Sequence, residues 1–207
     1  MSVWTLLSFF PASVLLTLAP GPDNTFVVAQ GISRGRRAAV TAALGMACGI
    51  SAHTTAAAVG ISALLYSSAW AFTILKFAGA AYLLYLAFRS LREQSLLLHP
   101  NAGTAPNGFA MFRRGFIMNV LNPKVALFFL AFFPQFVSRD AGHVVLQMLL
   151  LGAVFMIQAA VLFSIIGWLS GSVGALVLRR PRIAKYFGWL SAGIFASLGV
   201  KLALARR

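Results

Sequence analysis

Asp23 is the residue of this sequence best placed to do chemistry. It lies inside an apolar run from Val3 to Ile32, and a carboxylate at membrane depth costs roughly 2.5–3.5 kcal/mol on insertion scales. The chain has two other acidic residues, Glu93 and Asp140, and both follow arginines in connecting segments. An acid kept at that cost indicates a functional site, where the carboxylate binds a cation or takes up a proton.

The residues around Asp23 interrupt the helix that the apolar run otherwise predicts. Pro20, Gly21 and Pro22 come directly before it, and Asn24 follows. Because proline breaks the hydrogen bonding of a helix interior, we expect the helix to stop and restart here, with Asp23 in the first turn of the second piece. The restarted helix would present free backbone N–H groups and its positive dipole end to the middle of the membrane.

A second break of the same kind lies in the other half of the chain. Asn122 followed by Pro123 is typical of a helix start, with asparagine as the N-cap and proline at the first helical position. Lys124 adds a cation to this break. Asn119 precedes Asn122 by three residues, which predicts that both side chains lie on one helix face.

The two breaks are predicted to meet. Asp23 lies 11 residues before Arg34, and Pro123 lies nine residues after Arg114. At about 1.5 Å per residue, both breaks are roughly 14–17 Å from the same basic face, near the middle of a hydrocarbon core about 30 Å thick. Asp23 would bind an ammonium, and Lys124 with the two helix starts would bind a carboxylate. Together they would suit a zwitterionic amino acid.

Each of these residues also has a purely structural interpretation. Asp23 would equally serve as a helix cap that pairs with Lys124, and Lys124 would otherwise extend to the cytoplasmic surface. Asn119 and Asn122 would either hydrogen-bond substrate or satisfy unwound backbone at the break.

Four further polar residues are candidates for lining a path through the protein. Gln30, Gln135 and Gln158 would line it or would join neighbouring helices. His53 is a proton-relay candidate because histidine titrates near neutral pH, or else a core histidine bonded to a neighbouring helix. A metal site is not expected, since His53 has no acidic or cysteine companion in the sequence.

Membrane-spanning helices must position these residues. The chain is 60% hydrophobic and 10% charged, which is typical of an integral membrane protein, and a span needs about 20 apolar residues. Six stretches reach that length: Val3–Ile32, Ala38–Tyr66, Ala69–Phe88, Gly115–Val137, Val144–Gly167 and Tyr186–Leu204. We therefore predict an all-α integral membrane protein, a single transporter domain over residues 1–207.

The six predicted spans form two sets of three. A polar connector at about residues 94–110 separates a first repeat (about 1–93) from a second (about 111–207). Because three is odd, the two sets must face opposite ways across the bilayer, which is an inverted repeat with the first helix of each half broken. Paired breaks of this kind are the best sequence indication of a transporter binding site.

The net charge of +14 is explained by the loops. Eleven basic residues fall on one predicted side and five on the other; the eleven are Arg34, Arg36, Arg37, Arg89, Arg92, Arg113, Arg114, Arg179, Arg180, Arg182 and Lys185. The positive-inside rule places them in the cytoplasm and both termini outside, although Arg206 and Arg207 argue the other way. Anionic lipid is the expected partner, not nucleic acid, and a single cysteine, Cys48, excludes dithiol chemistry.

Two stretches resemble the signatures of a known family. One is Ala19-Pro20-Gly21-Pro22-Asp23-Asn24, continuing through Gln30 and Gly31 to Ser33-Arg34-Gly35-Arg36-Arg37; the other runs from Gly115-Phe116 through Asn119-Val120-Leu121-Asn122-Pro123-Lys124 to Phe132-Phe133-Pro134-Gln135-Phe136. They are similar to the first-span and fourth-span signatures of the lysine exporter (LysE/RhtB) family, over essentially the whole chain. The resemblance implies a bacterial inner-membrane permease, a six-helix inverted repeat, coupling to the proton-motive force, and dimers.

The resemblance also implies export of amino acids or close derivatives; homoserine, homoserine lactone, threonine, leucine and the basic amino acids are substrates within the family. We therefore expect a proton-coupled exporter without cofactor or enzymatic activity, in which Asp23 alternately holds the substrate ammonium and a proton. The absence of a second acid at depth favours neutral amino acids, with lysine or arginine as the alternative. A divalent-cation exporter would need more oxygen ligands, and a membrane scaffold would not need two matched breaks.

Overall fold

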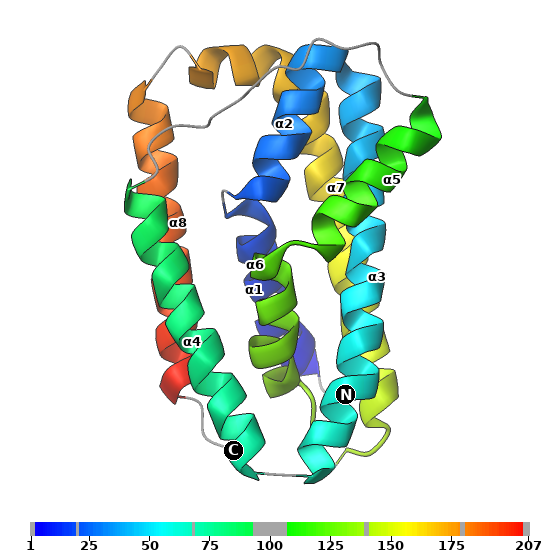
Figure 1. Ribbon diagram of the computed structural model, residues 1–207, viewed down its shortest axis with the longest axis vertical. Helices are drawn as coiled ribbons and strands as arrows, with labels where there is room; N and C mark the ends of the chain where they lie inside the picture. The colour runs from blue at the N-terminus through cyan, green and yellow to red at the C-terminus, as the bar shows by residue number, and fades with distance from the viewer. Residues whose placement is uncertain are drawn as a thin grey trace.

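A computed structural model describes residues 3–19, 21–67, 69–92, 107–138, 141–178 and 181–204 (Figure 1). Pro20, Glu93, Asp140 and most of the predicted connector lie outside the described residues. The regular structure in these ranges is entirely helical, which confirms the all-α part of the predicted fold class.

The helices follow the predicted spans closely. They are α1 (Val3–Leu18), α2 (Pro22–Arg34), α3 (Arg36–Ser67), α4 (Ala69–Arg92), α5 (Gly108–Val120), α6 (Pro123–Leu127), α7 (Val144–Leu178) and α8 (Pro181–Leu204). After α6 the chain forms a π-helical turn, η1 (Phe128–Phe132), and a 3₁₀ turn, η2 (Phe133–Phe136). The first predicted span thus corresponds to α1 with α2, and the fourth to α5 through η2.

Both predicted helix breaks are present. The axes of α1 and α2 differ by 54°, and those of α5 and the segment Pro123–Phe136 differ by 48°. Pro22 opens α2 after Gly21, whose φ of 178° is ordinary extended backbone. At the second break the Oδ1 atom of Asn122 accepts a hydrogen bond from the backbone N–H of Lys124 at 2.9 Å, so the predicted N-cap is confirmed.

The number of membrane crossings is only partly established by length and composition. Two stretches, Arg36–Gly60 in α3 and Val144–Ser170 in α7, are each long and apolar enough to cross a membrane. Counting each bent pair as one crossing gives up to four among the described residues. The six-span count and the inverted repeat stay predictions.

The two halves run in opposite directions along the bundle (Figure 1). The bent pair α1–α2 leads toward one end, whereas α5–α6 leads away from that end. Helix α3 packs against α7, and α4 packs against α8. Helix α1 starts and α8 finishes at the same end, opposite the α2–α3 junction with its arginines.

Glycines allow α3 and α5 to cross at close range. A Cβ atom at Gly45 would lie 2.0 Å from the backbone oxygen of Phe112, and one at Gly115 would lie 2.1 Å from that of Ala42. No side chain larger than hydrogen fits at either position, because real Cβ contacts are never that short. This crossing holds the start of the second break against α3.

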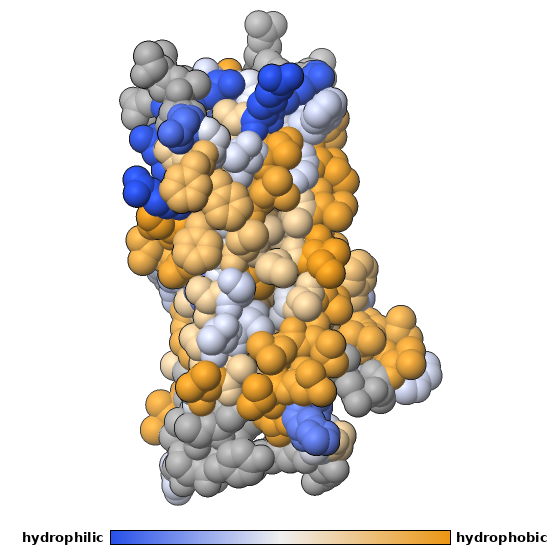
Figure 2. All heavy atoms as spheres, turned by 90° about the vertical axis from the view of Figure 1, so that its right-hand side faces the viewer, coloured by the Kyte–Doolittle hydropathy of each residue, from blue (hydrophilic) through white to orange (hydrophobic). Residues whose placement is uncertain are grey.

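The face drawn in Figure 2 is mostly apolar along the length of the bundle, and strongly hydrophilic side chains gather at one end. Large hydrophobic side chains are widely exposed, with Trp70 and Trp4 each 79% exposed. An apolar exterior of this extent suits contact with lipid. Five of the buried polar side chains, Asp23, His53, Asn119, Asn122 and Lys124, lie at or beside the two breaks.

Candidate functional site

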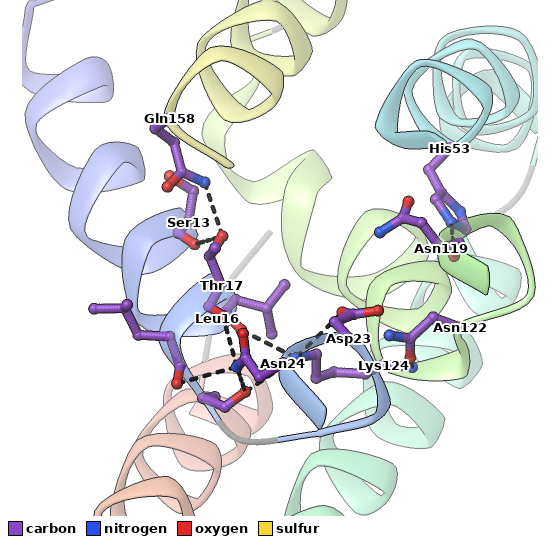
Figure 3. A network of polar contacts seen from close by, with 12 residues as sticks. Ser13, Leu16, Thr17, Asp23, Asn24, His53, Asn119, Asn122, Lys124 and Gln158 are labelled. Atoms are coloured by element: carbon purple, nitrogen blue, oxygen red, sulfur yellow. Dashed lines mark hydrogen bonds and ion pairs between the residues drawn. The ribbon is translucent and has the colours of Figure 1, made fainter. Parts of the chain in front are cut away.

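The two breaks meet at a buried ion pair. The Nζ atom of Lys124 lies 3.5 Å from Oδ2 of Asp23, and the two side chains are 3% and 1% exposed. Lys124 therefore does not extend to the cytoplasmic surface. The predicted meeting of the breaks is confirmed, and Figure 3 shows the two residues facing each other from α2 and α6.

The ammonium of Lys124 also contacts the end of α1. It donates hydrogen bonds to the backbone oxygens of Leu16, at 3.2 Å, and Ala19, at 3.1 Å. The last carbonyls of a helix have no partner within the helix and carry its negative dipole end. Lys124 thus binds where free carbonyl oxygens and a carboxylate converge.

Asn24 satisfies the remaining carbonyls of the same helix end. Its Nδ2 atom donates to the backbone oxygens of Thr17 (3.1 Å), Leu18 (3.3 Å) and Ala19 (2.9 Å). Together, the Asn24 amide and the Lys124 ammonium contact all four carbonyls from Leu16 to Ala19. The free carbonyls at the break in the first half are therefore hydrogen-bonded by a neutral amide from the same half, Asn24, and by a charged ammonium from the other half, Lys124.

The start of α2 has no comparable side-chain cap. Gly21 occupies the N-cap position, and no side-chain hydrogen bond caps this helix. Asp23 lies in its first turn, and its Oδ1 atom is buried without a hydrogen-bond partner among the described residues. Asp23 therefore pairs with Lys124 through one oxygen and leaves the other without a partner.

The two asparagines of the second break have different surroundings. Asn122 caps α6 with its oxygen, while its Nδ2 atom is buried and without a partner in the described part of the chain. Asn119 is 0% exposed, and neither Nδ2 nor Oδ1 of its side chain has a partner there. A buried amide with both atoms unpaired costs about 1–3 kcal/mol per lost bond, so Asn119 is a strong candidate for contacting a ligand.

His53 supports the second break from α3. Its Nε2 atom donates to the backbone oxygen of Asn119 at 3.0 Å, because a carbonyl can only accept, and its ring stacks on Phe129 at 5.7 Å. This is the geometry of a core histidine bonded to a neighbouring helix. Its role as a proton relay stays a prediction.

A small cavity connects these groups. It encloses about 210 Å³ of space free of protein atoms, its opening included, and Leu16, Thr17, Asp23, Ile50, Asn119, Lys124, Val125, Phe155 and Phe163 line it. The same small cavity is therefore lined by charged and polar side chains, Asp23, Asn119 and Lys124, and by the rings of Phe155 and Phe163.

Of the three predicted path-lining glutamines, Gln158 lies beside the site. Its Nε2 atom donates to Oγ1 of Thr17 at 2.9 Å, and Thr17 lines the cavity. Gln30 instead bonds Arg34 within α2, and Gln135 bonds the backbone oxygen of Ala131 at 3.3 Å. Neither of these two lines the cavity.

Sequence reasoning missed several cavity-lining residues, among them Thr17 of α1, Ile50 of α3, and Phe155 and Phe163 of α7. Ser13 and Thr17 stand four residues apart on α1, and this polar stripe was a usable signal; Thr17 bonds the Ser13 backbone oxygen at 2.9 Å. No comparable signal distinguished Phe155 and Phe163 from the other phenylalanines.

Comparison with known proteins decides the family. The family model of the LysE type translocators matches residues 14–206. The chain belongs to this family. The predicted resemblance is thereby confirmed, and the protein is a LysE type translocator of the membrane, a class of transporters and not of enzymes.

Named relatives cover the whole translocator. A homoserine/homoserine lactone efflux protein of Salmonella typhimurium is 32% identical over 96% of both chains. A threonine efflux protein of Salmonella typhi is 27% identical over 97% of this chain and all of its own. An uncharacterized membrane protein of Vibrio cholerae is 31% identical over the full length of both. No solved structure matches the chain.

Proposed function

We propose that this translocator is a secondary exporter that carries a small amino acid, or a close derivative, out of the cytoplasm of a bacterial cell in exchange for protons. The observation that carries the proposal is the buried pair of Asp23 and Lys124 where the two breaks meet. Relatives named as homoserine and threonine efflux proteins support the amino-acid substrate.

The charges of the site fit the two ends of a zwitterion. Asp23 has one carboxylate oxygen without a partner among the described residues, and this oxygen would receive the ammonium of the substrate. Lys124, with the N–H groups at the starts of α2 and α6, would receive the carboxylate. The unpaired amide of Asn119 is on the cavity wall and would contact the substrate backbone or side chain.

Coupling to protons would use the same carboxylate. Asp23 cannot hold both a proton and an ammonium, so protonation from outside releases the substrate there. An acid that alternates between proton and substrate is a common device of intramembrane transport sites. Gln158 and Thr17, on the α1 side of the cavity, are the proposed neighbours of the released substrate.

Alternating access would follow from the two halves. We propose six crossings arranged as a 3+3 inverted repeat, with the backbone at Pro20, Gly21, Pro22 and Pro123 allowing the halves to rock. The opposite running directions of α1–α2 and α5–α6 support this arrangement (Figure 1). In this scheme, a small cavity with its charges buried would suit an intermediate between inward-facing and outward-facing states.

The substrate class follows from the charge count of the site. Asp23 is the one acidic residue among the lining residues that the structure describes, and Lys124 already pairs with it. A lysine or arginine substrate would bring a second cation without a second carboxylate. This favours neutral amino acids, with basic amino acids as the alternative.

Export from dipeptide-fed cells tests the function. Cells that hydrolyse dipeptides accumulate amino acids, and expression of the translocator should raise efflux of the neutral substrate over a panel that includes homoserine, threonine, leucine, lysine and arginine. Asp23→Asn should reduce that efflux at least about tenfold, the change that a loss of 1.4 kcal/mol in binding produces. Asp140→Asn makes the same chemical change at the other aspartate and should leave efflux unchanged. Equal efflux from Asp23→Asn and wild type would refute the proposal.

A further inference from the structure

The Lys124 ammonium is held by three oxygens that all belong to the first half of the chain. They are the backbone oxygens of Leu16 and Ala19, at 3.2 and 3.1 Å, and Oδ2 of Asp23, at 3.5 Å. A lysine ammonium has three N–H donors, so the number of acceptors matches the number of donors. The first half therefore forms an ammonium site, and the second half supplies the ammonium (Figure 3).

Nothing in this oxygen set is specific for a lysine side chain. Carbonyl oxygens at a helix end and a carboxylate would bind any primary ammonium, including the α-ammonium of an amino acid. Asn24, by contrast, caps the same helix end with a neutral amide from its own half. Lys124 is the charged ligand of the site that comes from the opposite half.

The cavity adjoins the ammonium site. Leu16, Asp23 and Lys124 all line it, and the Oδ1 atom of Asp23 is buried without a partner in the described chain. A ligand in the cavity would therefore meet the free oxygen of the same carboxylate that Lys124 occupies through Oδ2. Two ammonium groups cannot both be neutralised by one carboxylate at this depth.

We infer that the end of α1 and Asp23 form a single ammonium-binding site, that Lys124 occupies it in the substrate-free protein as a tethered surrogate, and that the ammonium of the substrate displaces it. The inference rests on the proposed function for the identity of the substrate, but the site itself binds primary ammonium groups in general. The displaced Lys124 then faces the carboxylate of the same substrate.

The surrogate keeps the site neutral in both states. Without substrate, Asp23 and Lys124 cancel; with substrate, the zwitterion adds no net charge, and each end finds a partner. An uncompensated charge at this depth would be costly. Lys124 therefore allows the empty site to close, and it competes with every incoming ammonium at the effective concentration of a tethered group, on the order of millimolar or higher.

Binding of methylammonium to purified protein tests the surrogate. This cation has the ammonium of an amino acid but no carboxylate, so it gains nothing from Lys124. In Lys124→Met, methylammonium should bind at least about tenfold more tightly than in wild type at the same pH, because its tethered competitor is gone. The readout is the rise of the thermal unfolding midpoint in detergent with methylammonium concentration.

Two variants control the experiment. Lys76→Met removes a lysine ammonium on α4 that lines no part of the cavity, and it should bind methylammonium as weakly as wild type. Asp23→Asn in the Lys124→Met background should abolish the gain. A Lys124→Met protein that is stabilised no more than wild type, or a gain that survives Asp23→Asn, overturns the inference.

Gly21→Ala tests the same point with the charge retained. A Cβ atom at Gly21 would lie 3.3 Å from Nζ of Lys124, and the extended backbone there accepts alanine without strain. Crowding the ammonium should weaken its hold on the site and strengthen methylammonium binding in the same direction as Lys124→Met. Unchanged or weaker binding in Gly21→Ala contradicts the inference even if Lys124→Met does not fold. Methylammonium binding is measured without transport. A negative binding result would therefore overturn this inference and leave the result of the export assay, which tests the proposed function, unaffected.

Discussion

At the scale of single residues, the site depends on side chains that close broken helix ends. Asn24 and Lys124 together contact the four carbonyls from Leu16 to Ala19, and Asn122 caps α6. In a soluble protein, water would satisfy many of these groups. In a bilayer the protein must supply every partner itself, so the same residues serve both the fold and the site.

Replacement of Asn24 by alanine should destabilise the protein by about 1–3 kcal/mol, because the backbone oxygens of Thr17 and Leu18 lose the partner that the structure gives them. The measurement is the free energy of unfolding by denaturing detergent. Ser33→Ala, also on α2, removes a hydroxyl bonded to the Ala29 oxygen of its own helix and should cost less than about 0.5 kcal/mol. Equal effects of the two changes would contradict the capping role of Asn24.

Replacement of Asn122 by alanine should cost about 1 kcal/mol, the usual value for an N-cap, and should also reduce export, because α6 carries Lys124. Asn107 caps α5 at its exposed start, accepting from the Ala110 N–H at 2.8 Å. Asn107→Ala should therefore lower stability by a similar amount and leave export unchanged once protein amount is corrected. If both variants lost export equally, the loss would reflect reduced stability alone, and the expected role of the Asn122 cap in transport would be contradicted.

The sequence was sufficient to predict most of this chemistry and insufficient for its geometry. The cost of a buried acid identified Asp23, and the Asn122–Pro123 pair identified the second helix start. The hydrogen bonds from Lys124 to Leu16 and Ala19 depend on the bend angles and on which way a long side chain turns, and no local pattern encodes either. Backbone carbonyls carry no sequence signal, so two of the three oxygens around the Lys124 ammonium could not be predicted.

At the scale of helices, close crossings position the breaks. Helices α3 and α5 approach closely at Gly45 and Gly115. A Cβ atom at Gly49 would lie 2.8 Å from the Asn119 side chain, so the glycine leaves room for Asn119. The segment after α6 continues as π-helical and 3₁₀ turns. Its rings Phe128, Phe129 and Phe133 pack with Phe9 and Phe155 beside the cavity. The lengths of the apolar stretches predicted the helices but could not predict these irregular turns, because tertiary packing selects them.

Gly45→Ala should destabilise the protein by about 1–3 kcal/mol, the usual cost of overpacking, because the new methyl group meets the Phe112 backbone oxygen. Gly60 lies on the same helix, and a methyl group added there would meet no described atom within 4 Å. Gly60→Ala should therefore stabilise the protein by about 0.5–1 kcal/mol through helix propensity. Unfolding in denaturing detergent measures both changes, and a neutral Gly45→Ala would show that α3 and α5 are not in close contact.

At the scale of the whole molecule, the charge distribution predicts the orientation. The ends of α2 and α4 and the start of α3 carry arginines, and α5 carries Arg113 and Arg114 near its middle. Figure 1 places the α2–α3 junction opposite the start of α1 and the end of α8. The positive-inside rule puts this arginine-bearing end in the cytoplasm. Alkaline phosphatase fused after Arg207 should be active and a fluorescent protein fused there should be dark. Bright fluorescence from that fusion would reverse the proposed orientation and, with it, the direction of the proton exchange.

Proton-driven transport in proteoliposomes tests whether Asp23, where the two breaks meet, exchanges a proton for the ammonium of an amino acid. With the best substrate from the cell panel, wild-type protein should move the amino acid against its concentration gradient when a pH gradient is imposed, and Asp140→Asn should do the same. Asp23→Asn should show no accumulation under any pH gradient. Accumulation by Asp23→Asn at the wild-type level would contradict the proposed exchange.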